Sequence, residues 1–276
     1  MVDSNTAQKA ICAHPVVSPV FPEEEFHWTT VRLREVLDRG LRLEGKVFGI
    51  EGRHARETLK RCKWPIVSVG GENGLAKSIT VPGRVKRKYL SSDAPEAIGF
   101  LGSSEMLDVK PVPYKWVFKN EPKYQQFKIR EGLVLISCSG TIGNVTYVSK
   151  TLNNFMISQH AIRISADFPG YIYAFLKTSI GQALVKTNMY GAVVSEIEPH
   201  HFDNVLIPDP PPILKKRIHD LILESYKLRD ESNELLDQAE QLLYYALNLP
   251  PIDNIRPQYF DPSFEVRNFI VKFVAN

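Results

Sequence analysis

The sequence lacks the features that would mark a secreted, membrane-embedded or metal-stabilised protein. Its three cysteines, Cys12, Cys62 and Cys138, are far apart and have neither zinc-site spacing nor the even number of a disulfide framework. No apolar run approaches the length of a membrane span, and residues 1–19 lack the charged start and apolar core of a signal peptide. We therefore expect a cytoplasmic protein with no membrane segment, metal or cofactor.

An excess of charge of one sign is also absent. The chain has 34 Lys and Arg against 31 Asp and Glu, a formal net charge of +3. Overall charge therefore does not predict nucleic-acid binding, and a local basic patch would have to provide it. With 276 residues, 43% of them hydrophobic, the chain has ample material for a core in one large domain or two smaller units.

Enzyme signatures are incomplete. Residues 70–78 resemble a phosphate-binding loop, but Ala76 stands where a glycine must precede the lysine. Residues 209–212 (Asp-Pro-Pro-Pro) lack the stacking aromatic of the adenine methyltransferase motif, and no glycine fingerprint follows a strand. His200 and His201 are adjacent, so on an extended chain they would point to opposite sides and chelate one ion poorly. We expect no catalytic residue and no metal site, which makes an independent methyltransferase or nuclease the weakest hypothesis.

What the sequence does contain is an uninterrupted helical pattern from Ile213 to Leu247, with no Pro or Gly, stopped by Pro250 and Pro251. Apolar and small residues recur at steps of four and three, which is the pattern of a coiled-coil seam. The large apolar members of that seam are Leu214, Ile218, Leu221, Leu228, Leu235 and Leu242. The helix would span roughly 50 Å. It either lies on its own domain or pairs with a second helix in an antiparallel coiled coil.

Before the helix, the periodicity indicates a mixed domain, so the expected fold class is α+β: a mixed α/β domain followed by a long α-helix. Residues 133–139 and 145–148 predict two strands joined by a glycine turn at 140–144, and 155–164 a strand pair or one long strand. Helices are expected after Thr29 or Thr30 up to Gly40, and over residues 51–63 and 170–186. The organisation predicted is an irregular segment 1–25, a mixed domain 26–212, the helix 213–249, and a Phe-rich tail 250–276. The tail either packs on this domain or begins a second module.

The most basic short run contains Arg84, Lys86, Arg87 and Lys88. Alternation would place these cations beside Tyr89 on a strand or strand edge. The run is either a solvated face or a set of phosphate contacts, and the sequence leaves both open.

One segment adds a family resemblance. Leu133 to Asn144, LVLISCSGTIGN, resembles the apolar run followed by Ser-x-Ser-Gly-Thr-Ile-Gly of specificity (S) subunits of type I restriction–modification systems. The resemblance covers roughly residues 28–251, as one target-recognition domain plus one spacer helix. The chain departs from the family pattern at Ile213 to Lys216, where Glu-Gln is usual, and in carrying one domain and helix rather than two. Further similar segments are 158–164, 171–186, 188–191 and 206–212.

The resemblance implies a non-catalytic subunit that reads one half of a bipartite target in double-stranded DNA. A methyltransferase (M) subunit and a restriction (R) subunit would supply methylation and cleavage. The basic run would contact the DNA backbone, and a single domain implies a homodimer or pairing with a second specificity half. Further DNA contacts would come from Thr141, Asn144, Lys186, Asn188 and Tyr190. The alternative is a protein-interaction adaptor that dimerises through the long helix without sequence-specific DNA binding.

Overall fold

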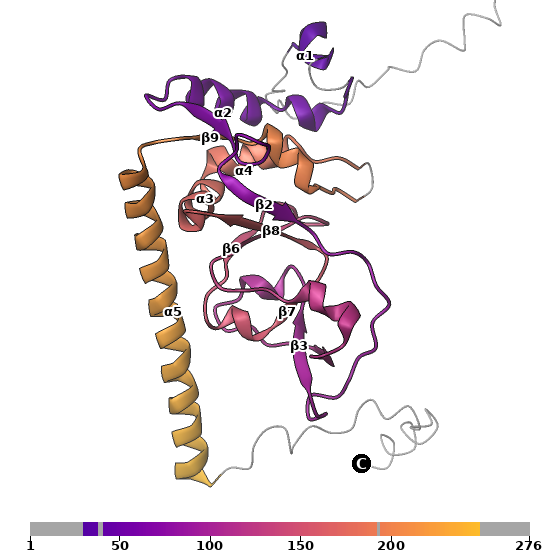
Figure 1. Cartoon of the computed structure of the whole chain (residues 1–276), viewed down its shortest axis with the longest axis vertical. Coiled ribbons are helices and arrows are strands. Elements are labelled where there is room, and N and C mark those ends of the chain that lie inside the picture. Colours follow the sequence, from indigo (N-terminus) through magenta and orange to yellow (C-terminus); the bar gives the residue numbers. More distant parts are fainter. Residues whose placement is uncertain (1–29, 38–40, 192–193, 249–276) are drawn as a thin grey trace, which may run out of the picture.

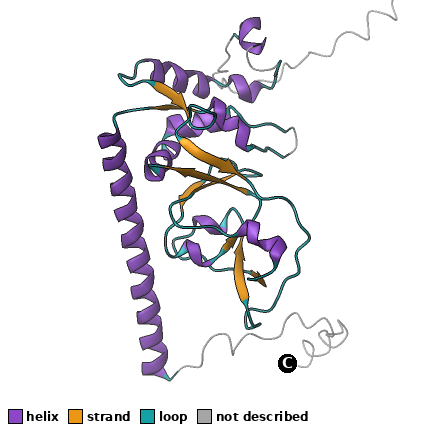
Figure 2. Ribbon diagram, viewed as in Figure 1, coloured by secondary structure: helices purple, strands orange, loops and turns teal. Residues whose placement is uncertain are grey.

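The computed structural model describes residues 30–37, 41–191 and 194–248, and shows a mixed α/β domain beside one long helix (Figures 1 and 2). The fold class expected from the sequence is therefore observed: small sheets and short helices precede helix α5, Pro212–Leu247. The segment 1–25, the tail 250–276 and Gly40 lie outside the described residues, so their predictions stay predictions.

The central sheet has four antiparallel strands in the order β2 (Ala76–Thr80), β8 (Ala161–Ala166), β5 (Val134–Ser137) and β6 (Val145–Tyr147). Every residue of β5 is buried, which explains why its sequence is a continuous apolar run rather than an alternating one. The strand, turn and strand predicted for residues 133–148 are confirmed.

A second sheet has the order β4 (Lys115–Phe118), β3 (Ala97–Leu101) and β7 (Met156–Ile157), with β3 and β7 parallel. The chain leaves this sheet after β7 and enters the central sheet at β8, so residues 155–164 form a strand pair split between two sheets. The sequence pattern identified neither β3 nor β4. A third pair joins β1 (Ile66–Ser68) to β9 (Leu206–Pro208).

Short helices cover these sheets. Helices α1 (Leu33–Leu37) and α2 (Ile50–Lys60) lie where the sequence predicted helices. The single helix expected over residues 170–186 is wrong: α3 (Pro169–Lys177) and α4 (Ser179–Lys186) are separated at Thr178, whose backbone is extended at ψ 158°. Its hydroxyl accepts a hydrogen bond from Gly181 N at 3.0 Å and so begins a new helix. Short 3-10 helices complete the fold: η1 (Gly45–Phe48), η2 (Glu105–Leu107), η3 (Pro122–Phe127), η4 (Leu152–Asn154) and η5 (Pro199–Asn204).

The buried side chains form three clusters. The largest fills the space between the central sheet, α3, α4 and one face of α5. A second lies between the central sheet and the loop that carries η2. The third, here called the aromatic cluster, lies between the second sheet and η3. It consists of Phe100, Val117, Tyr124, Phe127 and Met156.

Helix α5 lies along its own domain on one face only (Figure 1). Ile218, Ile222 and Leu223 pack against the main core, so the prediction that Ile218 belongs to a free seam is wrong. Farther along, Asp230 accepts hydrogen bonds from Ser149 Oγ at 2.8 Å and from the backbone nitrogens of residues 150 and 151. Asn233 Nδ2 donates to Val109 O at 2.7 Å. These contacts hold the rod against the domain well beyond its first turns.

The opposite face of α5 is open to solvent. Leu221, Leu228, Leu235 and Leu242 are 65, 56, 64 and 67% exposed. Leu214 is also exposed, and these five leucines recur at intervals of seven residues. We call them the leucine seam. The sequence left open whether this helix lies on its own domain or pairs with a second helix. In the structure one face of α5 is docked on the domain, and the opposite face is free to pair.

Candidate nucleic-acid interface

The basic run lies in an extended segment, residues 81–89, that is not part of any sheet. A single bridge joins the next residue, Leu90, to Trp116 on β4, so the strand that we expected is absent. The segment nevertheless alternates. Arg84, Lys86 and Lys88 are exposed, whereas Val85 and Arg87 are half-buried, because Val85 packs on the aromatic cluster and Arg87 lies over Phe100. Three of the four predicted cations are therefore presented to solvent.

The glycine turn 140–144 is held from two sides. The Ser137 hydroxyl donates to Thr141 O at 2.6 Å and accepts from Asn144 N at 3.0 Å. Gln182 Nε2 on α4 donates to Gly143 O at 2.7 Å. Thr141 is exposed at the tip and Asn144 is half-buried, so the turn presents Thr141 on a rigid backbone.

A second loop segment lies beside this turn. Tyr190 and Glu196 exchange two backbone hydrogen bonds, at 2.9 and 2.8 Å, and Gly140 N donates to Ser195 O at 3.2 Å. Arg84 reaches the same place and pairs with Glu196 Oε1 at 3.5 Å. The fold thus brings together three segments that the sequence singled out separately: the basic run, the glycine turn and the loop at Tyr190.

Tyr190 itself is engaged by acidic partners. Its hydroxyl donates to Glu198 Oε1 at 2.6 Å and lies 3.2 Å from Glu196 Oε2, and its ring stacks on His201 at a centroid distance of 5.3 Å. The hydrogen bond to Glu198, together with burial, raises the pKa of Tyr190. Two carboxylates at one hydroxyl disfavour a phosphate there, so Tyr190 supports the loop in this state of the protein.

The two remaining predicted residues differ in accessibility. Lys186 is exposed in the last turn of α4, on the rim of a groove of about 650 Å³ that also contains Lys46, Ile50 and Met189. Asn188 is only 7% exposed, and its Nδ2 donates to Leu184 O at 2.8 Å. That burial does not fit a DNA contact by Asn188, which instead closes the end of α4.

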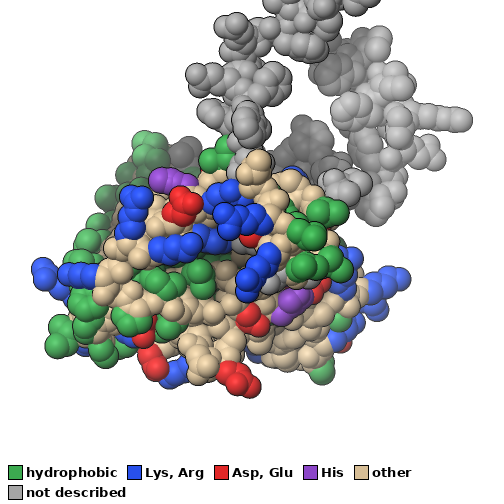
Figure 3. Space-filling view, turned by 90° about the horizontal axis from the view of Figure 1, so that it is seen from above, with side chains coloured by type: hydrophobic (Ala, Val, Ile, Leu, Met, Phe, Trp, Pro, Cys, Tyr) green, Lys and Arg blue, Asp and Glu red, His purple; other side chains and the backbone are tan. Residues whose placement is uncertain are grey.

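Other cations border this region without having been predicted. Lys46 Nζ donates to Ser195 Oγ at 3.3 Å, and Arg42 donates to the backbone carbonyl of Met189. Seen from the end of the molecule that carries α1 and α2, Lys and Arg side chains gather around a shallow hollow (Figure 3). The sequence alone could not identify Arg42 and Lys46 as candidates, because neither belongs to a basic run. Their position beside the Tyr190 loop is visible only in the structure.

Gln159 and His160 occupy the link between β7 and β8, next to the basic run. Arg87 Nη1 donates to Gln159 Oε1 at 2.5 Å, and Gln159 Nε2 lies 3.0 Å from His160 Nε2. Burial, assisted by the charges of Arg84 and Arg87, lowers the pKa of His160, which is therefore neutral at pH 7.

Adjacent histidines do not behave as we expected. Residues 199–204 form a 3-10 helix rather than an extended chain, and the rings of His200 and His201 lie on one side with centroids 4.0 Å apart. His201 Nδ1 accepts a hydrogen bond from Glu198 N at 3.0 Å, so the His201 side chain caps the start of this helix. Within the described ranges, no group of three or more His, Cys, Asp and Glu side chains is arranged to hold a metal ion.

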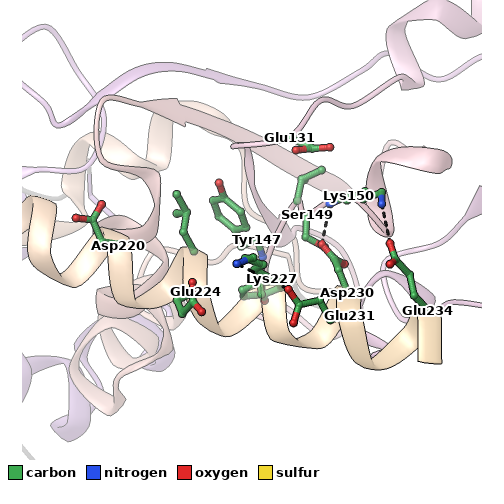
Figure 4. A pocket seen from close by; sticks show the side chains of 13 residues that line it. Glu131, Tyr147, Ser149, Lys150, Asp220, Glu224, Lys227, Asp230, Glu231 and Glu234 are labelled. Carbon is green, nitrogen blue, oxygen red and sulfur yellow. Dashed lines mark hydrogen bonds and ion pairs between the residues drawn. The ribbon is translucent and has the colours of Figure 1, made fainter. Parts of the chain in front are cut away.

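A second hollow, of about 570 Å³, lies between α5 and the end of β6 (Figure 4). Carboxylates line it on both sides, among them Glu131, Glu224 and Glu234, and Lys150 is paired with Glu234 at 2.6 Å. These carboxylates would repel a phosphate. The segment with the exposed cations Arg84, Lys86 and Lys88 is therefore the better place for nucleic acid. None of the helices described here is both long and apolar enough to cross a bilayer.

The described residues thus define a mixed α/β domain with a basic loop face, docked on one long helix. No protein-family model matches the sequence, and no curated protein matches it. Solved structures of type I restriction–modification S subunits are similar to it. The S subunit from M. genitalium is 13% identical, with 66% of this chain and 43% of that chain covered and a TM-score of 0.43. The HsdS subunit from Thermoanaerobacter tengcongensis is 19% identical, with 72% and 49% covered and a TM-score of 0.41.

A chain from a structure of the assembly and conformational transition of the type I R-M system is 17% identical, with 78% and 53% covered and a TM-score of 0.46. This chain spans about half the length of the structures that it matches.

Proposed function

We propose that this chain is a non-catalytic DNA sequence-specificity subunit, or half-subunit, of a type I restriction–modification complex. Its mixed domain reads one half of a bipartite target, and α5 sets the separation from the other half. The observation that carries the proposal is the contact of Arg84, in a basic run whose Lys86 and Lys88 are also exposed, with the Tyr190 loop beside the glycine turn, on a domain docked to a long helix.

The surface that carries the exposed cations Arg84, Lys86 and Lys88 suits the DNA backbone. Exposed Lys and Arg side chains neutralise phosphates and fix the register of a protein on a duplex, while a few polar groups read base edges. Lys86 and Lys88 have no carboxylate partner among the described residues, so no protein ion pair has to break before they meet a phosphate. Thr141 and Lys186 extend the same proposal to the turn and the end of α4.

The leucine seam supports pairing with a second helix. Five leucines at heptad spacing on the solvent side of a 36-residue helix form an apolar stripe that water covers poorly. We propose an antiparallel mate. Antiparallel pairing places the acidic half of one helix, residues 230–247, beside the start of the other, where Lys216 and Arg217 are exposed. Glu234, Asp237 and Glu240 also pair with lysines of their own domain.

The partner helix belongs to a second copy of this chain or to a second specificity half. Either arrangement places two recognition domains at a fixed distance and predicts a gapped target, palindromic in the case of two identical copies. The M subunit would supply methylation and the R subunit cleavage, so the chain itself needs no catalytic residue, cofactor or metal.

The test is selection of sequences from a random duplex library by the full-length chain, alone and with its methyltransferase subunit. We expect enrichment of one gapped sequence and an affinity that falls steeply with salt, because phosphate contacts release counterions. No enrichment at any salt concentration would sink the proposal. The exposed leucine seam by itself also suits a dimerising adaptor without DNA specificity, and such an adaptor would show no salt-dependent affinity for DNA.

A further inference from the structure

Among the four cations of the basic run, Arg87 differs in direction and in surroundings. Its neighbours Lys86 and Lys88 are exposed, whereas Arg87 is half-buried on the side of the aromatic cluster. A side chain placed for general attraction to phosphates gains nothing from such burial. Arg87 therefore has a role different from that of the other three cations.

The guanidinium of Arg87 is held in one place by three contacts. Its Cζ lies 4.9 Å from the ring centre of Phe100 and 5.6 Å from that of Phe127. The two rings are buried and meet edge to face at 5.3 Å, so they form a fixed support. Arg87 Nη1 donates to Gln159 Oε1 at 2.5 Å. A long flexible side chain is thus already ordered before any ligand arrives, which lowers the entropy cost of binding.

The orientation of Gln159 follows from hydrogen-bond logic. Arginine has only donors, so the amide must turn Oε1 toward Arg87 and Nε2 toward His160. Gln159 Nε2 is a donor, so His160 Nε2, 3.0 Å away, must accept and the ring carries its proton on Nδ1. Burial keeps the imidazole neutral, which this arrangement requires. The three residues form one chain of donors directed from Arg87 to His160.

Arg87 retains unused donors. No described residue accepts a hydrogen bond from its Nη2 or Nε, and no described carboxylate pairs with it, whereas the neighbouring Arg84 pairs with Glu196. A guanidinium edge with two parallel N–H groups matches the O6 and N7 acceptors that guanine shows in the major groove. A fixed guanidinium favours such a base contact over a phosphate contact, because phosphates can be met by mobile side chains at many positions.

We propose that Arg87 reads a guanine in the half-site that this domain recognises, and that Gln159 and His160 are positioning residues that fix its guanidinium. This inference rests on the proposed function and names the base that its recognition surface selects. The other three cations at 84, 86 and 88 then hold the backbone on either side of that base.

The experiment is sequence selection from a random duplex library with the full-length chain, comparing wild type, Arg87→Lys, Gln159→Met and Gln159→Glu. Lysine keeps the charge but loses the paired donors, so Arg87→Lys should lower the preference for guanine at one position of the half-site that this domain reads by roughly 5- to 150-fold. Gln159→Met should lower it at the same position, and Gln159→Glu, which keeps an acceptor for Arg87, should retain more of it. The matched control Lys88→Ala should weaken binding to all sequences without changing the selected one.

The outcomes separate the two proposals. If wild type enriches no sequence, the proposed function fails. If wild type enriches a sequence and both Arg87→Lys and Gln159→Met select the same one with equal discrimination, the inference is overturned and the function stands. A uniform loss of affinity across sequences in Arg87→Lys would make Arg87 a phosphate contact and also overturn it. If Arg87→Lys does not fold, as judged by its melting curve, the Gln159→Met selection decides.

Discussion

The backbone N–H of Tyr147 on β6 donates a hydrogen bond to the hydroxyl of Tyr226 on α5, with 3.1 Å between nitrogen and oxygen. The same hydroxyl lies 3.3 Å from Thr146 Oγ1, and the ring of Tyr226 packs at 5.3 Å from that of Tyr147. One buried side chain therefore joins the central sheet to the rod. Together with the contacts of Asp230 and Asn233, it fixes the angle between the domain and α5, on which any fixed spacing depends.

Replacing Tyr226 by Phe should destabilise the protein by about 1–3 kcal/mol, because buried polar groups lose a partner while the ring volume is kept. The free energy of unfolding from urea denaturation would measure this. Tyr245→Phe is the control, since Tyr245 lies on the same helix with 86% of its surface exposed and should change nothing. Equal stability of the two variants would mean that Tyr226 contributes through its ring alone.

The exposed leucine seam leads us to predict the oligomeric state of the chain. Leu228→Glu combined with Leu235→Glu places charges in the apolar stripe, and should convert a dimer into a monomer in light scattering at micromolar concentration. Lys227→Glu introduces the same charge beside the seam and should leave the dimer intact. A wild-type chain that remains monomeric at every accessible concentration would contradict homodimerisation, and the seam would then have to pair with a second specificity half.

The two glycines of the turn should respond differently to alanine. Both have left-handed backbones, with φ of 75° at Gly140 and 92° at Gly143, so each substitution should cost about 1 kcal/mol through backbone strain. A Cβ at Gly143 would also lie 2.9 Å from Gln182 Oε1, whereas one at Gly140 meets nothing within 4 Å. Gly143→Ala should therefore lower the melting temperature more than Gly140→Ala. The reverse order would show that the turn does not depend on its tether to α4.

The exposed cations predict a change in salt dependence. Lys86→Ala with Lys88→Ala should reduce the slope of log affinity against log salt by roughly two, because each phosphate that is no longer neutralised removes about 0.9 from the slope. Fluorescence anisotropy with one labelled duplex over a range of salt concentrations measures this slope. Lys227→Ala, which borders the acidic hollow on α5, should leave the slope unchanged. An unchanged slope in the double variant would mean that Lys86 and Lys88 are solvated and do not contact phosphates.

Half-buried histidines predict a loss of stability in acid. Burial lowers the pKa of His219 below its ordinary value of 6.5, and its Nδ1 accepts a hydrogen bond from Gly170 N at 3.0 Å. The unfolded chain takes up a proton more readily than the folded one, so the contribution to stability is present above pH 6.5. It is lost as the pH falls through the lower, folded pKa.

Denaturation between pH 5 and 8 should therefore show the unfolding free energy falling below pH 6.5. His219→Gln should make that fall shallower, because one titrating group is removed. His160 and His201, whose pKa values burial also lowers, account for the slope that remains. An identical slope in wild type and His219→Gln would place the acid sensitivity elsewhere.

Local patterns predicted the elements that depend on near neighbours in the chain. The apolar stretches before and after the glycine turn indicated β5 and β6, and the helical pattern without Pro or Gly indicated α5 almost to its observed ends. Helix α5 illustrates the limit. Heptad spacing identified Leu221, Leu228, Leu235 and Leu242 as one face, but assigned Ile218 to it as well. Whether a helical face meets its own domain or solvent depends on which strands lie beside it.

The candidate site shows the same division more sharply. The sequence by itself determined which short segments carry charge, glycine and helical periodicity, because these are properties of consecutive residues. Only the tertiary structure decided that Arg84 meets Glu196, that Arg87 lies over Phe100 against Gln159, and that Asn188 is buried. The contacts of Arg84 and Arg87 join residues far apart in the chain, and no local propensity encodes them, because Gln159 and Phe100 come beside Arg87 only once both sheets have formed.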